Sequence, residues 1–389
     1  MSVTAASGFV ASGTAAGIKP DGRLDLSLVA TEDGRPVPAA AVFTQNQMTA
    51  APVVTTRNHL LRTTGHAAAV VLNSGNANAA NGRRGVDDAK RMCAATAAEL
   101  GCEAHEVLVC STGLIGIPLP IDAIEAGVPA LAAARAAGED AGLAAADAIL
   151  TTDTVRKLSV ADGPGFVVGG MAKGAAMLAP NMATMLAVLT TDAEATPALL
   201  KSALTAALPS SFNSLSVDGC TSTNDTVILM ASGRAGPVEP ADLIAAVTAV
   251  CEDLAAQMAG DAEGATKVVR VVVEGAVDDH EAERGARKVA ESQLVKCSWY
   301  GKDPYWGRVA SELGSAGISF DPDKLRISYG DHVVADGGIN ADHDADALSA
   351  YMDQRHIEVT AQLGLGTGRA TVLTNDLTHA YVDENMGTS

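Results

Sequence analysis

Aromatic side chains are scarce in this 389-residue chain: they make up 3% of its residues, whereas hydrophobic residues make up 48%. A large core is possible, but it must be built from Ala, Val, Leu, Ile and Met. Positive charge is scarce as well, because 27 lysines and arginines face 46 aspartates and glutamates, for a formal net charge of −19. Such a chain repels phosphate groups, so neither nucleic acid nor an anionic membrane is expected as a partner. A small acidic ligand could still bind through one well-placed cation.

No run of about 18 uncharged apolar residues stands out as a membrane-spanning helix. The N-terminus also lacks the basic start and apolar block of a signal peptide. The six cysteines are scattered without a Cys-x-x-Cys pair, which favours reduced, mostly buried thiols over disulfides or a zinc site. We therefore expect a cytoplasmic protein with no metal and no bound cofactor.

Several familiar catalytic motifs are missing too. The sequence has no Gly-x-Ser-x-Gly, no His-Glu-x-x-His and no Gly-x-x-x-x-Gly-Lys-Ser/Thr. All eight histidines lie outside the segments that carry candidate chemistry, which disfavours a Ser-His-Asp hydrolase. The glycine run at residues 364–368 is not followed by a helical pattern, so it does not indicate a dinucleotide-binding loop.

Strand-like and helix-like patterns alternate along the chain, which predicts an α/β fold. Short apolar runs at residues 67–72 and 107–110 are typical of buried strands, and the first leads into an asparagine-rich segment, residues 73–82. Helical spacing is found at residues 87–100, 241–258 and 280–295.

The second of these strands runs into Ser111-Thr112-Gly113. Glycine at this point lets the chain expose backbone N–H groups without a side chain in the way. Such donors could form an oxyanion hole. The commoner meaning of the pattern is a plain turn after a strand, and the residues alone leave both interpretations open.

Residues 173–192, KGAAMLAPNMATMLAVLTTD, combine an apolar, small-residue strand pattern with a lysine, a Pro-Asn pair and threonines. A threonine hydroxyl is a weak nucleophile without a base, and no histidine is at hand. If the chain cuts itself between Ala183 and Thr184, the freed α-amine, with a pKa near ~7.7–8, can serve as that base. Spacing alone favours a different interpretation, a β-branched residue in a buried strand.

The pattern Lys173-Gly174-x-x-Met177-x-x-Pro180-x-Met182-Ala183-Thr184-Met185-Leu186, with Thr190-Thr191-Asp192 behind it, resembles the ornithine acetyltransferase family, also called glutamate N-acetyltransferase. Seven further segments match that family in order over almost the whole chain. They are residues 73–78, 111–116, 151–154, 222–226, 261–267, 303–308 and 381–385. One segment alone is a weak match, whereas seven around the Ala-Thr junction make a specific one.

The resemblance implies a self-cleaving α/β fold of layered mixed sheets and helices, made as one precursor. Residues 1–183 would form an N-terminal α chain and residues 184–389 a C-terminal β chain, which stay together and usually pair as α2β2. It implies a ping-pong reaction of the cyclic arginine pathway. N2-acetylornithine gives its acetyl group to Thr184, ornithine leaves, and glutamate takes the acetyl to become N-acetylglutamate. Whether acetyl-CoA also serves as a donor is left open.

The same resemblance assigns roles to individual residues. Thr184 forms the acetyl ester with its own amine as base, while Thr112 and Gly113 stabilise the oxyanion, where removing one donor typically costs about 10²–10³ in rate. Lys173 supplies a cation for a substrate carboxylate or for charge near Thr184. Glu263 pairs with a substrate ammonium group. The remaining substrate contacts of the family match Thr151, Asn385 and Ser389.

Two positions depart from the family pattern. Tyr305 stands where an asparagine is usual, in a segment that we interpret as structural. The tail after Asn385 is one residue shorter than usual, which bears on the role of Ser389. The neighbours Thr151 and Thr152 both fit the substrate contact, and the choice between them stays open.

Two enzyme alternatives share the same nucleophile. One is a self-activated N-terminal-threonine amidohydrolase with water as the acceptor, and the other is a family paralogue in secondary metabolism. The non-enzyme alternative is a binding or structural α/β protein with Thr184 in its core. That alternative predicts an intact chain without acetyl chemistry.

Overall fold

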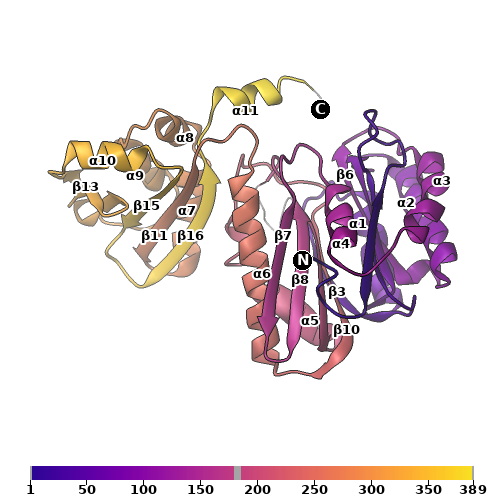
Figure 1. The fold of residues 1–389 in the computed structure, drawn as a ribbon. Coiled ribbons are helices and arrows are strands. Elements are labelled where there is room, and N and C mark those ends of the chain that lie inside the picture. Colours follow the sequence, from indigo (N-terminus) through magenta and orange to yellow (C-terminus); the bar gives the residue numbers. More distant parts are fainter. Residues whose placement is uncertain (1, 179–184, 388–389) are drawn as a thin grey trace. The chain divides into compact units, whose positions relative to one another are not determined.

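The computed structural model describes residues 2–178 and 185–387 (Figure 1). Ala183, Thr184 and Ser389 therefore lie outside the described residues. The described chain divides into two compact units, residues 2–213 with 220–258, and residues 214–219 with 259–387. Both units are mixed α/β structures, as the alternating pattern predicts.

The first sheet of the first unit has four strands in the order β1-β2-β5-β6. Their bounds are Phe9–Thr14, Leu26–Thr31, Ala69–Asn76 and Val107–Leu114. Strands β5 and β6 are parallel, and helix α2 (Gly82–Leu100) connects them. Because side chains alternate along a strand, Val70 and Leu72 enter one core while Val71 enters another. Burial on both faces explains the continuous apolar run at residues 67–72.

The second sheet of this unit has six strands in the order β4-β3-β10-β9-β8-β7. In that order their bounds are His66–Ala67, Val37–Phe43, Thr226–Pro237, Leu186–Glu194, Phe166–Lys173 and Lys157–Gly163. One hydrophobic core contains Leu72 and Leu108 of the first sheet together with Val188 and Ile228 of the second. The two sheets therefore pack face to face.

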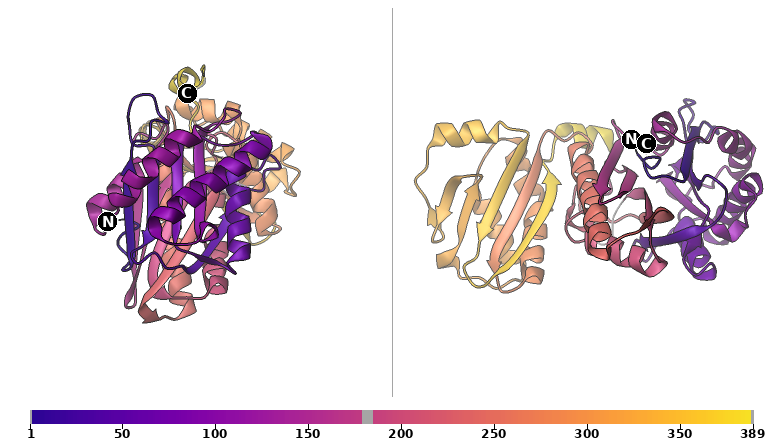
Figure 2. Two further views of the ribbon diagram at one scale, coloured as in Figure 1. Left: turned by 90° about the vertical axis from the view of Figure 1, so that its right-hand side faces the viewer. Right: turned by 60° about the horizontal axis from the view of Figure 1, so that its bottom comes forward.

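Helices cover the outer faces of both sheets. Helices α2 and α3 (Ile121–Ala133) share a core with the outer side of the first sheet, and Figure 2 shows them in front of its strands. Helix α6 (Pro240–Gly260) lies on the second sheet, where a Cβ on Gly170 of β8 would come 2.9 Å from Val250. The remaining helices of the unit are α1 (Ala51–Arg62), α4 (Glu139–Asp147) and α5 (Pro197–Ala207). Helices α2, α3 and α6 thus lie outside the two sheets, whereas Ala145 and Ala146 of α4 belong to the core between them.

Helix α6 differs from the sequence expectation in one respect. Within the described ranges it is the one helix long and apolar enough, by length and composition, to cross a membrane. Half of its apolar window is buried inside the protein, and the packing of Val250 and Leu254 under Gly170 accounts for that apolar face. A helix that covers a sheet needs such a face.

The second unit is built on a six-stranded sheet with the order β14-β13-β12-β15-β11-β16. In that order the bounds are Ile339–Asn340, His332–Asp336, Arg326–Tyr329, His356–Gln362, Val268–Ala276 and Gly368–Asn375. Its helices are α7 (Asp279–Ala290), α8 (Gln293–Tyr300), α9 (Trp306–Ser315), α10 (Ala345–Met352) and α11 (His379–Glu384). The core centres on the fully buried Trp299 and Tyr329.

Candidate active site

The candidate oxyanion residues lie at the end of strand β6. Thr112 and Gly113 still pair with β5, because the ladder continues past the apolar run to Leu114. Gly113 has φ +128°, and a Cβ there would come 2.3 Å from the backbone carbon of Gly75 and 2.5 Å from Asn76 N. Only glycine fits a backbone approach this close. The predicted strand end at residue 110 is therefore too early, since the polar residues after it belong to the same ladder.

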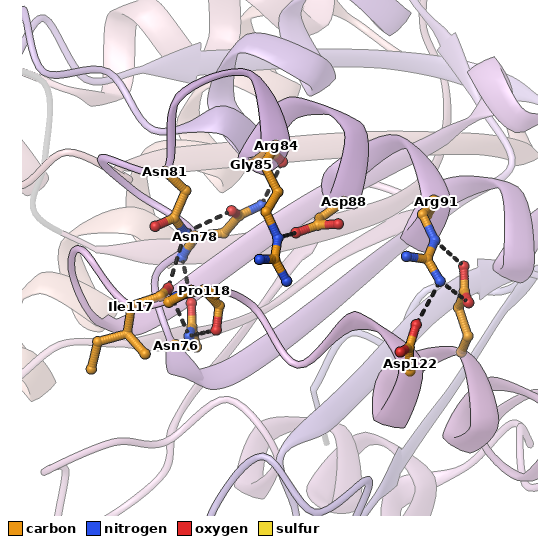
Figure 3. Close-up of polar contacts among 11 residues, drawn as sticks. Asn76, Asn78, Asn81, Arg84, Gly85, Asp88, Arg91, Ile117, Pro118 and Asp122 are labelled. Carbon is orange, nitrogen blue, oxygen red and sulfur yellow. Dashed lines mark hydrogen bonds and ion pairs between the residues drawn. The ribbon is translucent and has the colours of Figure 1, made fainter.

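Side-chain amides of the asparagine-rich segment hold the chain next to this point (Figure 3). Asn76 Nδ2 donates to the carbonyl oxygens of Ile117 and Pro118, both at 3.2 Å, and Asn81 Nδ2 donates to Ile117 at 3.0 Å. Asn78 is fully buried, and its Nδ2 donates to Gly85 O at 2.8 Å. Neutral amides can satisfy buried carbonyls without adding charge. They hold the loop that follows Gly113 in one conformation.

Lys173 ends strand β8 of the second sheet and reaches Thr112 on the first. Its Nζ lies 3.3 Å from Thr112 Oγ1, and its side chain is 10% exposed. The contact joins the predicted cation to the predicted oxyanion residue. It lies where β5, β6 and β8 end and where β9 and β10 begin.

A buried carboxylate, Asp153, organises the residues around Lys173. Its Oδ1 accepts hydrogen bonds from Lys157 Nζ at 2.5 Å and from Gly174 N at 2.7 Å, and its Oδ2 lies 3.8 Å from Lys173 Nζ. Burial alone would raise the pKa of Asp153, but the ammonium groups of Lys173 and Lys157 and the Gly174 N–H outweigh it and hold that pKa at about 2. Asp153 is therefore ionised at neutral pH.

Thr151 belongs to the same cluster. Its backbone N–H donates to Asp153 Oδ2 at 3.1 Å and its hydroxyl to the same oxygen at 3.4 Å. Its neighbour Thr152 is exposed. Of the two threonines that the sequence left open, Thr151 is the one joined to Asp153 beside Lys173.

A second buried carboxyl, Asp225, stands just before strand β10 and is 1% exposed. Burial raises the pKa of Asp225 well above its ordinary value, and hydrogen bonds from Ser222 and from the Met185 N–H, with the charge of Lys173, offset only part of that rise. Met185 immediately follows Thr184 in sequence, and its carbonyl also accepts from Thr226 N at 3.0 Å. The chain directly after the candidate cleavage point is thus anchored to this segment.

The raised pKa of Asp225 predicts a pH effect on stability. A carboxyl whose pKa is higher in the folded than in the unfolded chain stabilises the fold at pH values below its unfolded pKa. That contribution is lost as the pH rises through its folded pKa. We expect Asp225→Asn, which removes the charge and keeps the shape, to raise the free energy of unfolding at pH 7 and leave it little changed near pH 3. Urea titrations at both pH values measure this. Equal effects at the two pH values would contradict it.

Two other predicted site residues meet in the second unit. Asn385 Nδ2 donates to Glu263 Oε2 at 2.8 Å and to Tyr381 O at 2.9 Å, at the end of α11. Glu263 is 8% exposed. Tyr305, the departure from the family pattern, precedes α9 and stands beside Arg308, whose guanidinium lies 5.9 Å from its ring centre.

Sequence reasoning missed Asp153, Lys157 and Asp225 as parts of the site. Asp153 and Asp225 lie inside matched segments, residues 151–154 and 222–226, so that resemblance was the available signal. Lys157 lies outside every segment that matches the family. Within the described ranges, no group of three or more His, Cys, Asp or Glu side chains is placed to hold a metal ion.

Comparisons with known proteins show which family the chain belongs to. A family model described as the ArgJ family matches residues 10–387. The arginine biosynthesis bifunctional protein ArgJ of Mycolicibacterium paratuberculosis is 49% identical over all of this chain and 96% of its own, and that of Thermobifida fusca is 47% identical over all of both chains. A crystal structure of ornithine acetyltransferase complexed with ornithine, from Mycobacterium tuberculosis, is 45% identical and covers 46% of this chain and 95% of its own, with a TM-score of 0.42. The chain belongs to the ArgJ family.

Proposed function

We propose that the chain transfers the acetyl group of N2-acetylornithine to glutamate through an acetyl ester on Thr184. As a member of the ArgJ family it is an acyltransferase of arginine biosynthesis. The observation that carries the finer assignment is the cluster of Thr112 and Gly113 near the end of β6 with Lys173 at the end of β8, beside Asp153 in the segment before β7. It offers an oxyanion site and a cation side by side, in a protein expected to act in the cytoplasm.

The nucleophile would arise by cleavage between Ala183 and Thr184, giving chains of residues 1–183 and 184–389. The strand pairing supports this step. Strands β8 and β9 are antiparallel neighbours, with Lys173 opposite Leu186, so the cut falls in the connection between them. Strand β3 of the first chain likewise pairs with β10 of the second. Both chains would stay together after cleavage because their strands share one sheet.

Each half-reaction then uses the same groups. The α-amine of Thr184 takes the hydroxyl proton as Oγ1 attacks the acetyl carbonyl, and the oxyanion forms at Thr112 and Gly113. The amine of ornithine leaves with a proton. Glutamate's amine then attacks the ester carbonyl and regenerates the threonine hydroxyl. Lys173 binds the α-carboxylate that both substrates share, and Glu263, Asn385, Thr151 and Ser389 make further substrate contacts.

The experiment that tests this function follows a labelled acetyl group. The protein is incubated with N2-[¹⁴C]acetylornithine, the small molecules are removed, and glutamate or buffer is added. Labelled N-acetylglutamate supports acetyl transfer. Labelled acetate released equally with and without glutamate favours the amidohydrolase alternative. Label bound from acetyl-CoA in a parallel sample would add a second donor. Size-exclusion chromatography with light scattering tests the α2β2 assembly.

Lys173 gives a sharper test of the substrate site. We expect Lys173→Met to raise the KM for glutamate by about 10–100-fold, because a charge-assisted hydrogen bond is typically worth about 1.5–3 kcal/mol. Lys201→Met is the matched control: Lys201 Nζ donates to Ala41 O on strand β3, away from the cluster. Steady-state kinetics with varied glutamate measure both variants. An unchanged KM in Lys173→Met would remove this role.

A further inference from the structure

Strand β6 is the last strand of its sheet, and side chains of the same unit bond to its outer edge. The hydroxyl of Thr56, on helix α1, accepts from Val109 N at 2.8 Å and donates to Val109 O at 2.7 Å. Alternate residues of a strand turn their backbone groups to the same edge. Ser111 is therefore the next residue on this edge, and Gly113 follows it.

At Ser111 the bonding side chain is Asn224, in the segment before β10. Its Nδ2 donates to Ser111 O at 2.9 Å and to Ala77 O at 2.6 Å, and all three residues are buried. Ala77 directly follows β5, and its own N–H donates to Leu114 O at 2.9 Å. One side-chain amide therefore joins the chain segments at the ends of β5 and β6, next to Gly113.

The orientation of this amide is set by its neighbours. Thr223 Oγ1 donates to Asn224 Oδ1 at 2.7 Å, which leaves Nδ2 for the two carbonyls. A flipped amide would instead set its oxygen against two carbonyl oxygens. The backbone of Asn224 is held as well, because its N–H donates to Ser222 Oγ at 3.1 Å and its carbonyl accepts from Thr226 Oγ1 at 3.0 Å. The donor is thus fixed in place.

The hydrogen bond to Ser111 O fixes more than one atom. A peptide unit is planar and trans, so holding the carbonyl of Ser111 also sets the direction of the Thr112 N–H. The next peptide carries the N–H of Gly113, where the backbone lies so close to β5 that only glycine fits. Without Asn224 Nδ2, two buried carbonyl oxygens would lose a donor, and the chain would have to shift to satisfy them.

We propose that Asn224 is a positioning residue that sets the backbone orientation at Thr112 and Gly113, so that their donors meet the oxyanion without rearrangement. The proposal rests on the proposed function, because the oxyanion arises only if acetyl transfer takes place there. Preorganised donors stabilise a transition state because they need not turn during the reaction. Both half-reactions form an oxyanion at the same place, so loss of Asn224 should slow both alike.

Single-turnover kinetics at saturating substrate test this role. The cleaved protein is acetylated with N2-acetylornithine, separated from small molecules and deacetylated with glutamate, and each rate constant is referred to the fraction of cleaved chain. We expect Asn224→Ala to lower both rate constants by about 10–100-fold, part of the usual effect of an oxyanion donor. Saturation removes substrate affinity from the comparison. A loss of stability alone would not change the rate constants of protein that remains folded.

Thr56→Val is the matched control. It removes a buried hydroxyl that bonds Val109 on the same strand edge, two residues before Ser111. We expect this variant to have a lower Tm, because the backbone groups of Val109 lose their partner, and to keep both rate constants of the parent. Thermal denaturation and the same single-turnover assay measure the two effects.

The outcomes separate the two proposals. A parent protein that neither gains acetyl from N2-acetylornithine nor passes it to glutamate removes the proposed function and this role with it. With the parent active, the role of Asn224 is overturned if folded Asn224→Ala keeps the parent rate constants or is slowed in only one half-reaction. An equal loss of rate in Thr56→Val overturns it too.

A milder variant decides if Asn224→Ala does not fold or does not cleave. Thr223→Val removes the hydroxyl that orients the amide and leaves Asn224 itself in place. We expect it to lower both rate constants about three- to tenfold, the effect of one hydrogen bond. Rate constants equal to those of Thr56→Val, which loses the same chemical group, would contradict the proposal.

Discussion

Thr184→Ala is expected to purify as one intact chain with no acetyl transfer above background. The substitution removes the hydroxyl that the proposed cleavage uses to attack the Ala183 carbonyl, and without cleavage there is no free α-amine to act as base. Both steps therefore fail together, and the loss should be as large as the removal of any catalytic nucleophile. Denaturing gel electrophoresis and the labelled-acetyl assay measure the two effects separately.

Two further variants make this test specific. Thr184→Ser keeps a hydroxyl and an α-amine, so we expect it to cleave and to retain part of the activity. Thr190→Ala is the matched control on strand β9, where the lost hydroxyl donates to Val3 O at 2.7 Å. It should cost about 1 kcal/mol of stability and leave cleavage intact. Cleaved chains in Thr184→Ala would refute the assignment of the nucleophile.

Gly113→Ala is expected to reduce kcat by about 10²–10³-fold, the usual effect of losing an oxyanion donor. The added Cβ would meet Gly75 and Asn76 of strand β5 at 2.3–2.5 Å, which real side chains do not tolerate. The backbone must shift to relieve that contact, and the N–H groups at residues 112 and 113 shift with it. This variant displaces the backbone donors directly, whereas Thr112→Ala would leave them in place.

Gly116→Ala controls for backbone strain. Gly116 also has a positive φ, +81°, but a Cβ there meets nothing within 4 Å. We expect it to lose about 1 kcal/mol of stability through its backbone conformation alone and to keep its kcat. Thermal denaturation and steady-state kinetics on both variants separate strain from displacement. A folded Gly113→Ala protein with the parent kcat would contradict the oxyanion role.

The local spacing of apolar residues predicted several of the buried strands and helices. Residues 69–72 of the predicted strand 67–72 lie in β5, which is buried on both faces and continues to Asn76, whereas Ala67 belongs to β4 of the second sheet. Residues 87–100 and 241–258 fall inside α2 and α6. Residues 280–295 were predicted as one helix, but the structure has α7 ending at Ala290 and α8 beginning at Gln293. The break has a local cause: Ser292 caps α8 by accepting a hydrogen bond from Val295 N.

The candidate site depended on contacts that no local pattern contains. Lys173 and Thr112 are 61 residues apart and meet only because β6 and β8 belong to facing sheets. Residues 111–113 looked like a turn because they are polar, yet they extend the strand by pairing with the equally polar end of β5. Asp153 was visible only as part of a matched motif, since its partner Gly174 lies 21 residues away. Family resemblance supplied the residue identities, and the fold supplied their neighbours.

The central claim is that Thr184 carries the acetyl group between the two substrates. The most direct test is the intact mass of the purified protein under denaturing conditions, before and after addition of N2-acetylornithine without glutamate. We predict two chains, residues 1–183 and 184–389, of which the second gains one acetyl group and loses it again when glutamate is added. A single uncut chain, or two chains that never gain an acetyl group, would contradict the account.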